Sequence, residues 1–123
     1  MRLIPPSFRT ALAVSALCLG ASAQAGDADF TLVNRTGYDI AEVYISPANK
    51  NSWGRDRLGR NVLENGRSKL FTFSDRANCV QDLKVVFDDD NSSVVWEDFD
   101  LCDLNKITIR YNRRTGEVSA QSE

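Results

Sequence analysis

The densest group of side chains that could bind a metal ion is an acidic segment in the C-terminal third of the chain. It holds seven carboxylates and no Lys or Arg: Asp88, Asp89, Asp90, Glu97, Asp98, Asp100 and Asp103. Carboxylates suit Ca²⁺, which takes about six to eight oxygen ligands. We interpret the turn at Asp88, Asp89 and Asp90, joined by Asp98 or Asp100, as a candidate calcium site. The spacing is not that of an EF-hand loop, and the alternative is a solvated hairpin tip with charged strand ends.

A second candidate is the loop that contains Trp53, Arg55, Asp56 and Arg57. Aromatic and Arg side chains dominate the binding energy of many protein interfaces. The loop is therefore our candidate partner-binding surface. If residues 47–60 enter a partner's cleft, the protein is instead a small hydrolase inhibitor. The alternative is packing, with Trp53 folded inward over one end of the domain and Asp56 paired with a neighbouring Arg.

Basic residues gather in and just after the same loop. They are Arg55, Arg57, Arg60, Arg67 and Lys69. Opposed to the acidic segment, they would make the molecule dipolar and steer an anionic partner, such as a polymer of the cell envelope. Scattered surface charge is the plainer explanation.

The composition excludes several classes of function. The 123 residues include no His, which removes Ser–His–Asp and Cys–His catalysis and imidazole metal sites. The formal net charge of −2 provides no basic excess for binding nucleic acid. Glycoside hydrolysis needs two carboxylates at a defined separation in a cleft, which a domain this small rarely offers. We therefore expect no enzyme, and no cofactor other than the candidate Ca²⁺.

Residues 1–25 are typical of a cleavable secretory signal peptide. Arg2 and Arg9 form its positive region, 10–21 is a short apolar stretch, and the Ala-Gln-Ala sequence at 23–25 fits the small-x-small cleavage rule. Cleavage would leave a single domain, 26–123, with no membrane span. We expect a monomer that is periplasmic or secreted.

Cleavage would also remove Cys18 and leave Cys79 and Cys102. An even pair of cysteines in an exported chain is most simply one disulfide. In the chain-entropy model, closing a loop of roughly two dozen residues contributes about 3 kcal/mol. The alternatives are a redox pair or a thiolate metal site, but the chain has neither CxxC spacing nor further thiolate ligands.

Short runs of β-branched and aromatic residues, separated by turn residues, recur along the rest of the chain. They predict strands at 30–33, 38–45, 68–74, 80–87, 93–97 and 106–111, with short ones near 62–63 and 118. A turn is expected at 34–37, a hairpin at Asn65-Gly66, and Trp96 in the core. Six to eight short strands favour a small antiparallel β-sandwich, immunoglobulin-like or jelly-roll-like, with the disulfide between neighbouring strand ends.

Several motifs spread over most of the chain together resemble one family. They are NRTGY at 34–38, VYISP at 43–47, SWGRDRLG at 52–59, DLKVVFD at 82–88, WEDFDLC at 96–102 and ITIRY at 107–111. The family consists of small exported proteins of Gram-negative bacteria, and the resemblance implies a β-sandwich without an established activity. Its members often carry the label argininosuccinate lyase. That enzyme is a much larger helical tetramer with a Gly-Ser-Ser-x-Met-Pro loop and histidine chemistry, and this chain has neither.

Together, these patterns favour an exported, non-catalytic binding or accessory protein of the bacterial cell envelope, with a ligand that the sequence does not identify. A Ca²⁺-binding module built on residues 88–100 is the first alternative. A hydrolase inhibitor that presents residues 47–60 is the second.

Overall fold

Strands are the main regular secondary structure of the described chain. The computed structural model describes residues 26–50 and 52–123, so the predicted signal peptide lies outside the described residues. The elements are β1 (Phe30–Arg35), β2 (Ile40–Pro47), β3 (Ser68–Phe71), β4 (Val80–Phe87), β5 (Ser93–Asp100), the short 3-10 helix η2 (Leu101–Asp103), β6 (Lys106–Tyr111) and β7 (Val118–Ser122). Within these residues, no helix has the length and apolar character needed to cross a membrane.

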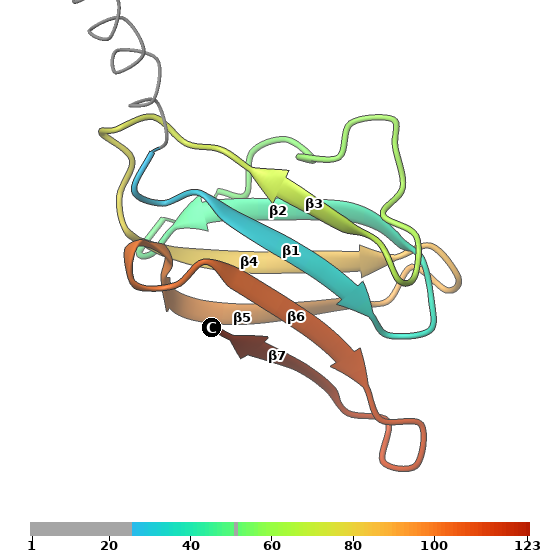
Figure 1. The fold of residues 1–123 in the computed structure, drawn as a ribbon. Coiled ribbons are helices and arrows are strands. Elements are labelled where there is room, and N and C mark those ends of the chain that lie inside the picture. The colour runs from blue at the N-terminus through green and yellow to red at the C-terminus, as the bar shows by residue number, and fades with distance from the viewer. Residues whose placement is uncertain (1–25, 51) are drawn as a thin grey trace, which may run out of the picture.

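The strands form two sheets stacked face to face, which confirms the predicted all-β sandwich (Figure 1). The nearer sheet has the order β3-β1-β6-β7, and the sheet behind it has the order β2-β4-β5. Most neighbouring strands are antiparallel, but β1 and β6 run parallel, with Leu32 opposite Ile107. Parallel neighbours need a long crossover, supplied here by everything between β1 and β6.

Alternating apolar residues give each sheet one face that is buried in the core. The inward residues of β1 and β6 are Phe30, Leu32, Ile107 and Ile109, and those of β2 and β4 are Val43, Ile45, Leu83, Val85 and Phe87. Full burial of such a side chain contributes about 1.5–3 kcal/mol, so this layer is the main source of stability. Trp96 packs against the layer and is half-buried, which agrees with its predicted inward position.

The predicted disulfide is present and joins neighbouring strand ends. Cys79 immediately precedes β4, and Cys102 lies in η2, directly after β5. The backbone N–H of Leu101 donates to the carbonyl oxygen of Cys79 at 2.8 Å. The covalent bond and the hydrogen bond therefore hold the same end of the β4–β5 hairpin.

The predicted hairpin at Asn65-Gly66 is wrong. Gly66 does turn the chain, with a φ of 86°. The residues before the turn, however, form only an isolated bridge, between Leu63 and Ile40 of the other sheet. The turn therefore carries the chain from the edge of β2 across to β3, and it joins two sheets rather than two paired strands.

A buried side-chain amide holds the bend at residues 36–38, which follows β1. Asn34 is fully buried, and its Nδ2 donates to the carbonyl oxygens of Tyr38 (2.8 Å) and Leu63 (2.9 Å). Its Oδ1 accepts from the backbone N and the Oγ1 of Thr36, at 3.1 and 2.8 Å. All the hydrogen-bonding positions of the amide are satisfied. One side chain thus ties β1 to the bend and to the segment that crosses between the sheets.

We expect Asn34→Ala to lower the free energy of unfolding by about 3 kcal/mol, because each buried polar group left unpaired costs about 1–3 kcal/mol. Urea denaturation followed by tryptophan fluorescence measures this loss. Asn112→Ala is the matched control, since the Asn112 Oδ1 also accepts two backbone N–H groups, but in an exposed turn. We expect the control to lose less than about 1 kcal/mol. Equal losses in the two variants would contradict the role given to burial.

Candidate ligand-binding cleft

The acidic residues predicted to share one calcium site lie at opposite ends of the β4–β5 hairpin. Asp88, Asp89 and Asp90 form the turn that follows β4. The register places Asp100 opposite Val80, the first residue of β4. Strands β4 and β5 have eight residues each, and a strand of eight residues spans about 25 Å at roughly 3.3 Å per residue. The predicted site that joins the turn to Asp98 or Asp100 is therefore not formed.

The carboxylates of Asp82 and Asp100 instead bind backbone N–H groups at this end of the hairpin. Asp98 adopts a φ of 62° at an irregularity of β5, and its N–H donates to Asp82 Oδ1 at 2.9 Å. Asp100 caps η2, because its Oδ1 accepts from the N–H of Cys102. Within the described residues, Asp100, Cys79 and Cys102 are the one group of three or more potential metal ligands whose ligand atoms all lie within 4.8 Å of one another, and both sulfurs are already in the disulfide. Calcium binding by the turn alone stays a prediction.

The Trp53 loop is anchored along the free edge of β2. Asp56 Oδ1 accepts from the backbone N–H of Val43 at 3.0 Å and of Leu58 at 2.9 Å. The N–H of Arg57 donates to the carbonyl oxygen of Val43 at 2.7 Å. Leu58 is buried in the core beside this anchor. Asp56 therefore binds backbone amides, and the expected pairing of Asp56 with an Arg is wrong within the part of the chain described.

The large side chains of this loop contact their own protein. The ammonium of Lys84 lies 5.9 Å from the ring centroid of Trp53 and 5.5 Å from that of Tyr44, so two rings share one cation. The guanidinium of Arg57 lies 5.0 Å from the ring centroid of Phe73. Trp53 therefore packs on the outward-facing Lys84 of β4, and the expectation that it folds inward over one end of the domain is wrong. Arg55 is exposed, and its role in binding a partner stays a prediction.

A hydrogen bond also keeps the hydroxyl of Tyr44 protonated. Tyr44 lies on the outer face of β2, between the buried residues Val43 and Ile45. Its hydroxyl donates to Glu42 Oε1 at 2.6 Å. Together with desolvation, this bond raises the pKa of Tyr44 to about 12. The hydroxyl therefore stays a neutral donor throughout the physiological range.

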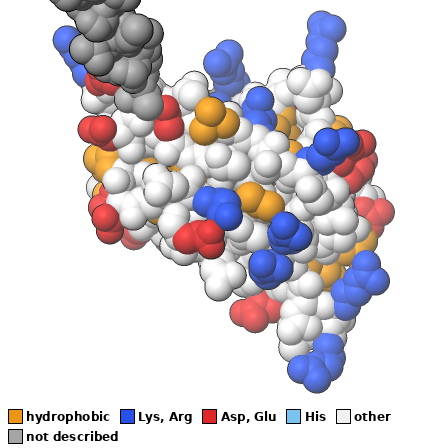
Figure 2. Space-filling model, viewed as in Figure 1, with side chains coloured by type: hydrophobic (Ala, Val, Ile, Leu, Met, Phe, Trp, Pro, Cys, Tyr) orange, Lys and Arg blue, Asp and Glu red, His pale blue; other side chains and the backbone are white. Residues whose placement is uncertain are grey.

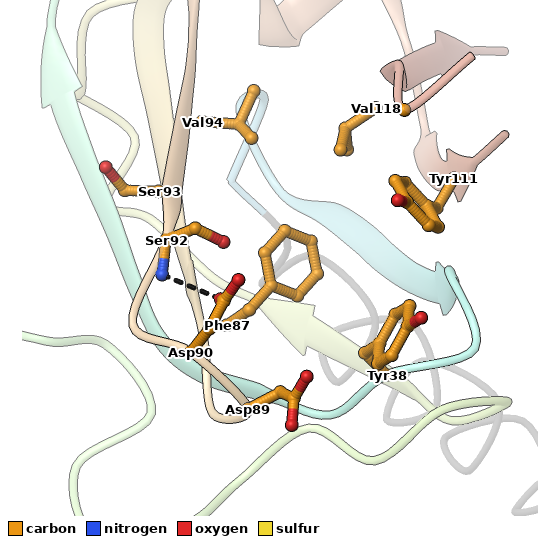
Figure 3. Close-up of a pocket in the computed structure, with 10 residues that line it drawn as sticks. Tyr38, Phe87, Asp89, Asp90, Ser92, Ser93, Val94, Tyr111 and Val118 are labelled. Carbon is orange, nitrogen blue, oxygen red and sulfur yellow. Dashed lines mark hydrogen bonds between the residues drawn. The ribbon is translucent and has the colours of Figure 1, made fainter. Parts of the chain in front are cut away.

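The feature that the sequence analysis missed is a cleft between the two sheets, at the end where β4 turns into β5. Its volume is about 330 Å³. The apolar wall consists of Tyr38, Phe87, Val94, Tyr111 and Val118, and the polar rim includes Asp89, Asp90 and Ser92. Figure 3 shows the three rings beside the cleft and the two carboxylates at its rim. We call it the aromatic cleft.

Four strand ends and the 36–38 bend position the wall of the aromatic cleft. Phe87 is the last residue of β4, and Tyr111 is the last residue of β6, opposite Val118. Tyr38 comes from the bend that Asn34 holds. The rings of Tyr38 and Tyr111 meet edge to face, with centroids 5.6 Å apart and an interplanar angle of 72°. Phe87 belongs to the buried core layer, whereas Tyr38, Val94, Tyr111 and Val118 are only half-buried and leave apolar surface open in the cleft.

The rim of the aromatic cleft is negative. Asp89 also lines an adjoining hollow with Asp39 and Asp88, so four carboxylates gather beside Tyr38. Across residues 26–50 and 52–123, the ion pairs are Arg67–Glu64 and Lys106–Glu123, and neither involves these acids. Hydrogen bonds from Ser92 hold the pKa of Asp90 below its usual range. The guanidinium of Arg113 lies 5.8 Å from the ring centroid of Tyr38, so one ring of the cleft already contacts a cation of the protein itself. The other aromatic faces, together with carboxylates that have no ion-pair partner among the described residues, attract a further positively charged group.

Comparisons of the chain with protein-family models, with curated proteins and with solved structures find no match. The family membership suggested by the motifs therefore stays a prediction. What the cleft can bind has to follow from its shape, its rings and its charge.

Asp56→Ala tests whether the Trp53 loop is anchored as described. We expect a loss of about 1–2 kcal/mol in the free energy of unfolding, because two backbone N–H groups lose their acceptor. Chemical denaturation measures it, and amide exchange should quicken at Val43 and Leu58. Arg55→Ala is the control, with an expected change within about 0.5 kcal/mol. An unchanged exchange rate at Val43 in Asp56→Ala would refute the anchor.

Proposed function

We propose that the protein is an exported, non-catalytic binding module of the bacterial cell envelope, and that its ligand site is the aromatic cleft. The ligand is an organic cation that carries an ammonium group. The observation that carries the proposal is the meeting of Tyr38 and Tyr111 with the carboxylates of Asp89 and Asp90 around one cleft. Export is supported by the signal-like residues 1–25 and by the disulfide.

The chemistry of the rim supports binding rather than catalysis. A general acid needs a carboxyl group whose pKa is raised toward neutrality by burial or by a neighbouring charge. The pKa of Asp90 moves the other way, because the Ser92 hydroxyl and N–H stabilise the carboxylate. A carboxylate that stays ionised suits the electrostatic attraction of a cation.

The size and depth of the cleft set the expected affinity. A cation over an aromatic face gains about 0.5–1 kcal/mol at an exposed site and about 2 kcal/mol when desolvated. Phe87 is buried and the other wall residues are half-buried, so the cleft lies between these limits. Two tyrosines and a negative rim therefore predict binding of a small ammonium compound in the millimolar to high micromolar range.

We expect choline to bind the cleft and its neutral isostere 3,3-dimethylbutan-1-ol not to bind, because the two differ mainly in charge. Titration followed by ¹H–¹⁵N NMR should move the amides of Tyr38, Asp89, Ser92 and Tyr111. Tyr111→Leu keeps an apolar wall but removes a ring, and should weaken choline binding about fivefold. Tyr44→Leu is the control. Tyr44 lies on β2 and does not line the cleft, so this variant should bind choline with unchanged affinity.

Three results separate this proposal from its rivals. Equal binding of choline and its neutral isostere would reject a cation site. Shifts centred on Trp53 and Arg55, lost in Trp53→Ala, would return the ligand to the Trp53 loop. Shifts at Asp90 with Ca²⁺ but not with choline, together with a melting temperature that EDTA lowers, would favour the calcium module.

The depressed pKa of Asp90 predicts how binding responds to acid. The carboxylate attracts a cation only while ionised, so choline affinity should fall as the pH drops through the folded-state pKa of Asp90. Ser92→Ala removes the side-chain hydrogen bond that lowers this pKa. We expect the midpoint of the acid loss to move to higher pH in Ser92→Ala, as NMR titrations at a series of pH values would show. Ser93→Ala is the control, and an equal shift in both variants would contradict the assignment.

A further inference from the structure

A second hollow lies on the other side of the 36–38 bend, and its charge is opposite to that of the aromatic cleft. Its volume is about 370 Å³, and its lining residues are Arg35, Thr36, Gly37, Asn65, Gly66 and Arg110. No acidic side chain lines it. We call it the arginine pocket.

The two arginines are held side by side by the parallel pairing of β1 with β6. Arg35 lies directly opposite Arg110 in the register. Asn34 and Ile109 beside them are buried, so alternation turns both arginines outward, and both are exposed. Like charges in directly opposed positions destabilise a sheet. In the part of the chain that the structure describes, neither arginine has an ion-pair partner, so nothing offsets this repulsion.

The remaining polar groups at the pocket add donors rather than acceptors. Asn65 Oδ1 accepts from the N–H of Gly37 at 2.8 Å, which leaves the amide Nδ2 as the donor end of that side chain. The guanidinium of Arg113 lies against the same bend but over the ring of Tyr38, 5.8 Å from its centroid, and Arg113 does not line the arginine pocket. Figure 2, which views this sheet from outside, shows Lys and Arg side chains spread over the face, with Asp and Glu side chains among them.

We propose that the arginine pocket binds a phosphate group. Arg presents a planar fork of N–H donors that matches a phosphate with paired hydrogen bonds, and an anion between two guanidiniums turns their repulsion into attraction. The phosphate is that of a phospholipid headgroup or of a soluble phosphate. This site is independent of the aromatic cleft, because the two share no lining residue.

The test is NMR titration of the purified, oxidised protein with inorganic phosphate, against sodium chloride at matched ionic strength. We expect phosphate alone to shift the amides of Gly37, Asn65 and Gly66 and the Nε signals of Arg35 and Arg110. Arg35→Gln and Arg110→Gln should each raise the Kd for phosphate at least tenfold. Arg60→Gln, an exposed arginine elsewhere, should leave it unchanged.

A second readout separates a binding role from a structural one. In phosphate-free buffer of low ionic strength, Arg110→Gln should melt at the same temperature as the unaltered protein or higher, because a like charge is removed. Cosedimentation with phosphatidylglycerol vesicles, lost in both Gln variants, assigns a lipid headgroup. Phosphate binding without cosedimentation assigns a soluble phosphate.

Several results would overturn the proposal. Equal shifts with phosphate and chloride would show only general screening. Unchanged phosphate affinity in both Gln variants would place the anion elsewhere. A melting temperature several degrees lower in Arg110→Gln without phosphate would make the arginine a structural residue. None of these results bears on choline binding, so the two proposals fail separately.

Discussion

The fully buried amide of Asn34 is the constraint on which both candidate sites depend. Its hydrogen bonds to Thr36, Tyr38 and Leu63 leave the bend after β1 one conformation. That bend aims the Tyr38 ring into the aromatic cleft and sets Gly37 beside the arginine pocket. A buried amide whose hydrogen bonds are all formed specifies the local geometry better than an apolar residue would. Any other arrangement would leave polar groups in the core without hydrogen-bond partners.

The two sides of the sandwich have different sheet edges, and this difference explains where the aromatic cleft opens. The edge of β2 is covered, because Asp56 and Arg57 bind the backbone of Val43 and the chain continues to a bridge at Ile40. On the opposite side, β5 and β7 are the edge strands of their sheets. The β6–β7 hairpin extends away from the body there (Figure 1). The Trp53 loop thus closes one side, and the aromatic cleft occupies the side left open.

Alternation and turn residues in the sequence predict most strands, the core side of Trp96, and the disulfide. They do not predict what depends on pairing between distant segments. The opposition of Arg35 and Arg110 and the meeting of Tyr38 with Tyr111 both require the parallel register of β1 and β6. The prediction of one calcium site in the acidic segment fails for the opposite reason. Its carboxylates are close in sequence, but the extended strands place them at opposite ends of a hairpin.

The same parallel pairing governs when the chain can fold. The two central strands of one sheet are β1, near the start of the described chain, and β6, near its end. Contacts between such distant segments slow folding, because the chain loses conformational entropy on closing the loop before the paired strands gain their stabilising contacts. Until β6 is available, β1 has only the four-residue β3 beside it. The sheet that contains β1 therefore cannot be completed until nearly all of the chain has been made, whereas the β2-β4-β5 sheet does not need β6.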